Sequence, residues 1–150
     1  LEGRAVHTWL VVKGESERWP TRWEVWQTEC GPYGHVCKNL MGPETHVGAG
    51  GTYVVAEVFG DAADRVARWV NTHAAEYPER AEYQLWPGPN SNSFTRWALE
   101  GAEWSPDLPR TAYGARWVPG MLAMLVGGWL LLLLAGWGLI RSVRRRSRAR

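Results

Sequence analysis

The sequence predicts a small α+β domain followed by one C-terminal transmembrane helix. Before residue 105, short β-rich stretches and two amphipathic helical stretches follow one another without an internal repeat. The stretch 117–140 then contains no charged residue, and 141–150 contains arginines but no acidic residue. We therefore expect a domain at 1–104, a linker at 105–116, a transmembrane helix at 117–140 and a basic tail at 141–150.

The strands are predicted from runs of β-branched and aromatic residues bounded by turn residues. Arg4–Lys13 is the first, and because both of its faces are largely apolar we expect it at the centre of a small antiparallel sheet. Arg22–Cys30 is the second. Further strands are expected at Thr52–Phe59 and Tyr83–Trp86.

Two helices are expected to cover this sheet. The first is predicted at Asp61–Tyr77, with Asp61 as N-cap and Pro78 as the stop. Its apolar stripe comprises Val66, Trp69, Val70 and His73. The second begins near Ser91 and buries Phe94, Trp97 and Ala98.

The net charge of +2 is the sum of two opposite charges. Residues 1–116 contain 11 Lys and Arg against 15 Asp and Glu, which gives −4, and the six arginines of 141–150 give +6. This division excludes a freely soluble globular protein. It also argues against nucleic acid as a partner, because the basic residues follow an apolar run instead of lying on a folded face.

The uncharged run is long enough to cross a bilayer. Its 24 residues would extend about 36 Å as a helix, against about 30 Å of hydrocarbon. Since arginines beside a span mark the cytoplasmic side, we expect a single-pass protein of the cytoplasmic membrane with 141–150 inside and 1–116 outside. The expected partners are the lipid bilayer, anionic lipid headgroups at the arginine tail, and a membrane protein that packs on the glycines of the span.

Leu1 is not a start methionine, and the first predicted strand begins at Arg4. We therefore expect this chain to begin inside a longer protein.

Cys30 and Cys37 are the two cysteines, and they flank a turn-like connection. In an oxidising compartment they would form a disulfide that closes a hairpin. A metal site built with His35 and His46 is an alternative, although the spacing matches no standard zinc template. Two unpaired thiols are the other alternative.

Ser91 draws attention because it follows two prolines at the predicted start of a helix. Free N–H groups and the positive end of the helix dipole favour a nucleophile and an oxyanion at such a place. The structural alternative is a serine N-cap. No phosphate-binding, dinucleotide-binding or zinc-hydrolase motif occurs, so no cofactor is expected.

Four segments together resemble a bacterial family catalogued as domain of unknown function number 3750. They are Ala5–Trp9, Trp23–Val25, the WPGPNSNSF run at Trp86–Phe94, and Asp107–Gly114. The resemblance covers nearly all of residues 4–114. It implies no activity.

The order of a His-Thr strand, more strands, and an Asn-nucleophile-Asn helix start is also similar to circularly permuted papain-like enzymes of the NlpC type, including the PPPDE peptidases and relatives of lecithin:retinol acyltransferase. This resemblance implies His7 as the base, Ser91 as the nucleophile and Glu24 as the residue that orients His7. Asn90 and Asn92 would support the turn or an oxyanion. Those families have cysteine where this chain has Ser91, and serine is the poorer nucleophile in a site built for a thiolate.

Three functions follow from these features. The first is a membrane-anchored hydrolase or acyltransferase acting on an amide or ester in peptidoglycan peptides, lipids or proteins. The second is a non-catalytic binding module or accessory subunit of a membrane complex, whose tryptophans supply core and contact surface. The third is a structural domain in which the WPGPNSN run is a rigid turn.

Overall fold

The computed structural model describes residues 5–48 and 50–118, together with 120, 124, 127–129, 132–133 and 137. Contacts within the chain divide it into two units, Leu1–Trp117 and Val118–Arg150. The described residues include no helix that is long and apolar enough to cross a membrane. Most of the expected span at 117–140, and the whole tail at 141–150, lie outside the described residues.

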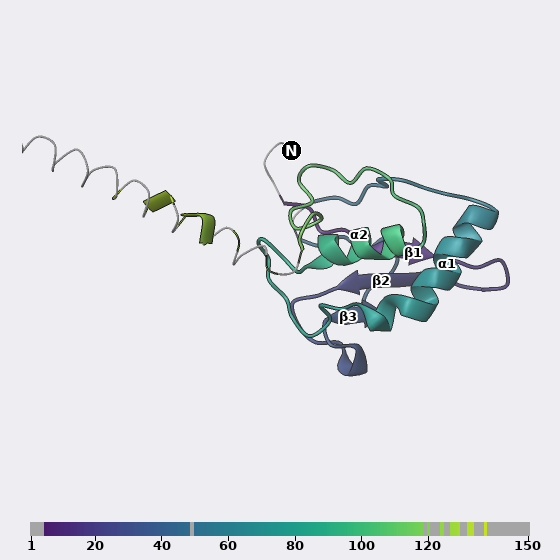
Figure 1. The fold of residues 1–150 in the computed structure, drawn as a ribbon. Helices are drawn as coiled ribbons and strands as arrows, with labels where there is room; N and C mark the ends of the chain where they lie inside the picture. Colours follow the sequence, from purple (N-terminus) through teal and green to yellow (C-terminus); the bar gives the residue numbers. More distant parts are fainter. Residues whose placement is uncertain are drawn as a thin grey trace, which may run out of the picture. The chain divides into compact units, whose positions relative to one another are not determined.

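The first unit has the predicted α+β architecture with a small antiparallel sheet (Figure 1). Its strands are β1 (Leu10–Val12), β2 (Thr21–Val25) and β3 (Val36–Lys38), in that spatial order. In the antiparallel register, Leu10 pairs with Trp23 and Val25 pairs with Val36.

Two α-helices and two short 3-10 helices complete this unit. They are η1 (Gly31–Tyr33), α1 (Asp61–His73), η2 (Ala74–Glu76) and α2 (Ser91–Gly101). Both α-helices pack on one face of the sheet, where their apolar side chains meet those of the strands. The core contains Leu10, Val12, Trp23, Val25, Val36, Val66, Ala67, Val70, Ala74, Tyr77, Phe94, Ala98, Leu99 and Ala102.

The alternation of side chains along β2 separates an apolar face from a charged one. Trp23 and Val25 point into the core beneath the helices. Arg22 and Glu24 are fully buried on the opposite face. There, Arg22 Nη1 donates to the carbonyl oxygens of Gly42 and Thr45, so the loop after β3 covers this face.

The first strand is shorter than predicted, and its central position was wrong. Only Leu10–Val12 pairs with another strand, at the edge of the sheet. The preceding residues bond elsewhere, because Val6 N–H donates to Thr111 O and Thr8 N–H donates to Asn92 Oδ1. A loop and a helix start thus take the place of a neighbouring strand.

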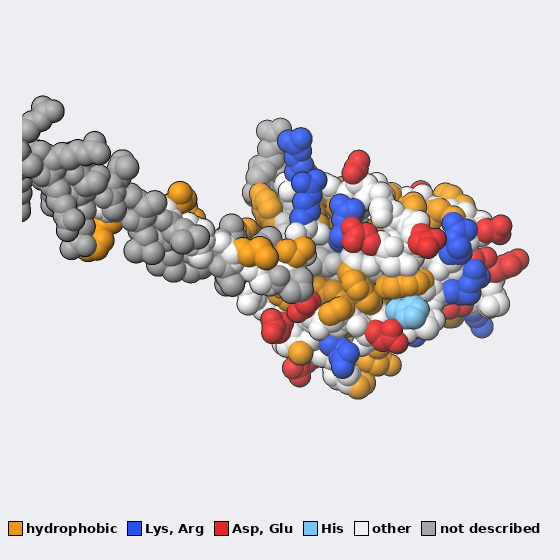
Figure 2. Space-filling view, viewed as in Figure 1, with side chains coloured by type: hydrophobic (Ala, Val, Ile, Leu, Met, Phe, Trp, Pro, Cys, Tyr) orange, Lys and Arg blue, Asp and Glu red, His pale blue; other side chains and the backbone are white. Residues whose placement is uncertain are grey.

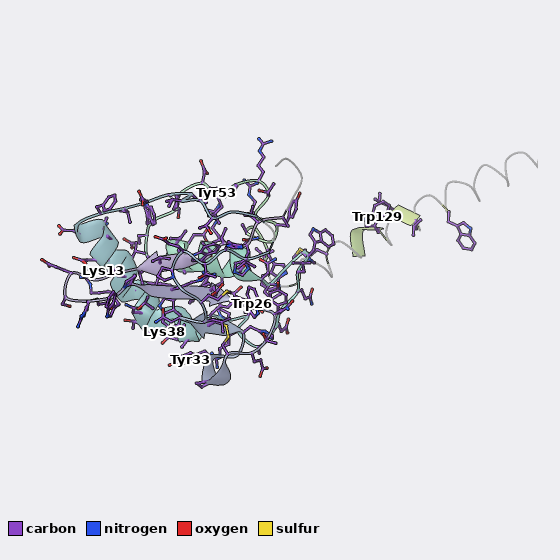
Figure 3. The ribbon with its side chains drawn as sticks, turned by 180° about the vertical axis from the view of Figure 1, so that it is seen from behind. Lys13, Trp26, Tyr33, Lys38, Tyr53 and Trp129 are labelled. Carbon is purple, nitrogen blue, oxygen red and sulfur yellow. A yellow bond between two sulfur atoms is a disulfide. The ribbon has the colours of Figure 1, made fainter. Side chains whose placement is uncertain are left out.

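Two of the predicted strands were wrong. Thr52–Phe59 contains no strand, and the side chains of Tyr53, Val54 and Phe59 are 60%, 67% and 80% exposed. Figure 3 shows Tyr53 on the outside of the domain. Tyr83–Trp86 also contains no strand, and Gln84 N–H donates to Pro89 O. β-Branched and aromatic residues favour strands only where a neighbouring strand and a core face exist.

The ends of two other elements also differ from the prediction. β2 ends at Val25, and α1 ends at His73. Gly60 is the N-cap of α1, so Asp61 lies inside the first turn, where its charge still favours the helix dipole. His73 is half-buried, since its side chain is 38% exposed, packs on the Trp69 ring and pairs with Glu76.

Candidate functional site

The helix α2 begins at Ser91, as predicted, and Asn90 is its N-cap. Asn90 Oδ1 accepts hydrogen bonds from Asn92 N–H (2.9 Å) and Ser93 N–H (3.3 Å), while Ser93 Oγ accepts one from Asn90 N–H (2.8 Å). This capping box fixes the first turn of the helix. Ser91 is therefore the first helical residue and not a serine N-cap.

Asn92 holds the residues on either side of His7 against this helix start. Its Oδ1 accepts from Thr8 N–H (3.1 Å) and Thr8 Oγ1–H (2.9 Å), and its Nδ2 donates to Val6 O (3.0 Å). The second Nδ2 hydrogen goes to Tyr113 O (2.8 Å). The segment that carries His7 thus lies against the start of α2, although the two are far apart in the sequence.

The two asparagines serve the structure of the turn through their side chains. Asn90 Nδ2 donates to Leu85 O (3.0 Å) and Tyr113 O (3.1 Å), and both Nδ2 hydrogens of Asn92 are engaged as well. An oxyanion would therefore have to bind backbone N–H groups. The N–H of Ser91 is available for this role, since it has no hydrogen-bond acceptor within the described part of the chain.

His7 and Glu24 come together on the charged face of the sheet. His7 Nε2 lies 2.9 Å from Glu24 Oε2, and Arg22 Nη2 donates to the same oxygen at 2.7 Å. The Trp26 ring packs edge-on against the imidazole at 5.3 Å between centroids, and the Trp9 ring lies 4.1 Å from the Arg22 guanidinium carbon. Aromatic rings therefore pack against both the imidazole and the guanidinium.

Glu24 remains ionised in this buried position. Burial raises its pKa, but the hydrogen bonds from His7 and Arg22 and the positive charge of Arg22 outweigh burial and hold the pKa below the ordinary value of 4.5. Glu24 Oε1 has no hydrogen-bond partner among the residues that the structure describes, so Oε2 carries both contacts. The carboxylate can thus orient the imidazole.

Within the described part of the chain, Ser91 makes no hydrogen bond to His7 or Glu24. It is four residues from Thr95 and hence on the same face of α2, and Thr95 Oγ1 lies within hydrogen-bond distance of Thr8 Oγ1 (3.0 Å). Ser91 therefore faces the segment that carries His7. It is 3% exposed, and its hydroxyl makes no hydrogen bond within the described ranges. The structure joins His7 to Glu24, and Ser91 begins the helix whose Asn92 bonds the residues on either side of His7.

Cys30 and Cys37 form a disulfide across the turn between β2 and β3, with their Cα atoms 5.2 Å apart (Figure 3, yellow bond near Tyr33 and Lys38). The free-thiol alternative is therefore wrong. The metal alternative loses its two thiolates, and His35 Nδ1 bonds Trp26 O instead (2.8 Å). The residues described by the structure contain no other group of ligands for a metal ion.

The sequence analysis missed Arg22, Trp9 and Trp26 as neighbours of His7. Arg22 had a usable signal, because it is two residues from Glu24 and must share its face on a strand. The sequence contained no signal for Trp9, because its contact with Arg22 depends on how the segment before β1 folds.

Comparison with known proteins identifies the family. Residues 2–117, more than half of the chain, match the family described as "Protein of unknown function (DUF3750)". No curated protein and no solved structure matches the chain. The match confirms the resemblance predicted from the WPGPNSN run and its companion segments. The chain therefore belongs to the DUF3750 family.

Proposed function

We propose that this protein is a membrane-anchored hydrolase or acyltransferase that acts on an amide or ester through Ser91, His7 and Glu24. The observation that carries the proposal is the 2.9 Å contact between His7 Nε2 and Glu24 Oε2, on a segment that Asn92 holds against the start of α2. A base oriented by a carboxylate next to a helix-start serine is the arrangement that serine nucleophiles use.

The contact with Glu24 assigns separate roles to the two imidazole nitrogens. Nε2–H donates to Glu24, which leaves the lone pair on Nδ1 to take the proton of the Ser91 hydroxyl. Ser91 Oγ then attacks the carbonyl carbon, and the Ser91 N–H with the α2 dipole stabilises the oxyanion. His7 passes the proton to the leaving group, and water or a second acceptor releases the acyl group from Ser91.

Arg22 makes this arrangement suitable for a serine nucleophile. A serine needs a neutral imidazole, whereas a cysteine site uses a thiolate–imidazolium pair. Because Arg22 already neutralises Glu24, the carboxylate orients His7 without requiring it to be charged. The order of His7, Glu24 and Ser91 along the chain also supports the permuted papain-like arrangement as part of this proposal.

The proposal includes the membrane anchor. The uncharged run at 117–140 would span the cytoplasmic membrane, with the arginines of 141–150 in the cytoplasm beside anionic headgroups and the domain outside. A disulfide between Cys30 and Cys37 supports this placement, because disulfides persist in oxidising compartments.

A serine-directed fluorophosphonate tests the proposal. We expect the native protein to be labelled and Ser91→Ala to lose the label. Ser105→Ala is the matched control, because Ser105 is an exposed serine after α2, and it should label like the native protein. Equal labelling of the native protein and Ser91→Ala would refute Ser91 as nucleophile.

The second candidate is a non-catalytic binding module or accessory subunit of a membrane complex. Its support is the 3% exposure of Ser91, which leaves little room for a substrate without local opening, together with the exposed apolar side chains at 53–59. This candidate predicts that the folded native protein is not labelled at any serine.

A further inference from the structure

Two large apolar side chains are exposed just before the candidate nucleophile. Leu85 and Trp86 are 71% and 66% exposed, in the loop between η2 and α2. The four residues that follow, Pro87 to Asn90, are buried. The loop thus presents its apolar pair outward from a firmly packed base.

This base is held against the last residues of the domain. A Cβ atom at Gly88 would lie 2.9 Å from Trp117 Cγ, so only glycine allows the loop to approach Trp117 so closely. Asn90 Nδ2 bonds Leu85 O and Tyr113 O at the same time. Leu85 and Trp86 are therefore fixed beside the point where the chain leaves the domain.

We propose that the side chains of Leu85 and Trp86 insert into the interfacial layer of the lipid bilayer. The proposal rests on the membrane span proposed above: the uncharged run begins at Trp117, so the bilayer that holds it would begin next to this loop. Indole rings favour the headgroup level of the bilayer, because there the apolar ring contacts lipid while the polar N–H remains hydrated. Figure 2 shows hydrophobic side chains at this end of the domain, as well as over the middle of the same face.

The contact would set the orientation of the candidate site. Ser91 follows Trp86 by five residues, and the capping box of Asn90 ties both to one rigid turn. With Trp86 at the bilayer surface, the N-terminus of α2 faces the membrane and not the open compartment. The site would then meet substrates that are attached to, or lie on, the membrane.

Quenching by brominated lipid tests the contact on the full chain. The protein is reconstituted into vesicles of phosphatidylcholine, with and without a phosphatidylcholine brominated near the carbonyl end of its acyl chains. The native protein is compared with Trp86→Leu and Trp19→Leu. Trp19 is the matched control, since it is 71% exposed in the turn between β1 and β2. Figure 1 shows this turn at the opposite end of the sheet from the start of α2.

The two substitutions should change the quenched fraction of tryptophan emission in opposite directions. Trp86→Leu removes a quenched residue, so the fraction falls, while Trp19→Leu removes an unquenched one, so the fraction rises. A rise for Trp86→Leu as well would overturn the interfacial contact while leaving the span intact. Failure of the native chain to float with the vesicles after an alkaline wash would refute the span, and the contact with it. Near-ultraviolet circular dichroism verifies that both variants fold.

Discussion

At the scale of single residues, the buried pair of His7 and Glu24 depends on Arg22. His7 Nε2 and Arg22 Nη2 both contact one carboxylate oxygen, Glu24 Oε2. Burying a carboxylate without such partners would neutralise it. Arg22 therefore holds Glu24 in the ionised form that can orient an imidazole.

Glu24→Gln should destabilise the fold in a pH-dependent way. It leaves Arg22 buried without its carboxylate, which costs about 3–5 kcal/mol near neutral pH. Because the folded-state pKa of Glu24 lies below 4.5, the native protein keeps this stabilisation above that pH and loses it as the pH falls through the folded-state pKa. The difference between the two proteins should therefore shrink in acid.

Urea unfolding at a series of pH values measures this difference. The control is Glu29→Gln, because Glu29 is an exposed carboxylate and its removal should change the free energy of unfolding by less than about 0.5 kcal/mol. A pH-independent effect of Glu24→Gln would mean that the ionised carboxylate does not stabilise the fold.

At the scale of elements, Asn92 joins the start of α2 to the segment before β1. Asn92→Ala removes four hydrogen bonds and leaves Thr8 N–H without its acceptor, so we expect a loss of about 3 kcal/mol. It should also abolish fluorophosphonate labelling, because His7 is no longer held beside Ser91. Gln27→Ala, at an exposed amide side chain, should change neither property. Full labelling of folded Asn92→Ala would show that the clamp does not position the site.

The disulfide stabilises the hairpin of β2 and β3. Cys30 and Cys37 are seven residues apart, and closing so short a loop contributes about 2–3 kcal/mol through the unfolded chain. We expect Cys30→Ser with Cys37→Ser to lower the free energy of unfolding by that amount. The native protein should show no titratable thiol until it is reduced. Equal stability of the two proteins would contradict this role.

Elements with a periodic pattern and a local signal were predictable from the sequence. The apolar spacing of α1, and Asn90 and the prolines before α2, were sufficient to place both helices to within a few residues. The strands were less predictable. Thr52–Phe59 has strand-forming residues but no partner, and Arg4–Lys13 gives its hydrogen bonds to Asn92 and Thr111. Hydrogen bonds to residues far away in the sequence cannot be predicted from the amino acids of the segment itself.

The residues of the candidate site also fall into those that the sequence predicted and those that only the structure shows. His7, Glu24 and Ser91 were predicted through a family resemblance, and the structure joins the first two by a hydrogen bond. The role of Asn92 as a clamp required knowledge of which backbone groups it reaches. Arg22 shares the strand face of Glu24, but its full burial beside the carboxylate is visible only in the structure.

At the scale of the whole molecule, the division of charge predicts a topology. A reporter fused after Arg150 that is active only in the cytoplasm should be active, and the same reporter fused after Trp104 should be inactive. This follows from the six arginines that flank the uncharged run on its C-terminal side. The reverse pattern would place the domain inside the cell.

The central claim is that Ser91 is a nucleophile activated by His7. Mass spectrometry of the fluorophosphonate-treated native protein, digested to peptides, tests it most directly. We predict a single adduct on Ser91, absent in His7→Gln. An adduct on a different serine, or equal modification of Ser91 in His7→Gln, would contradict the account.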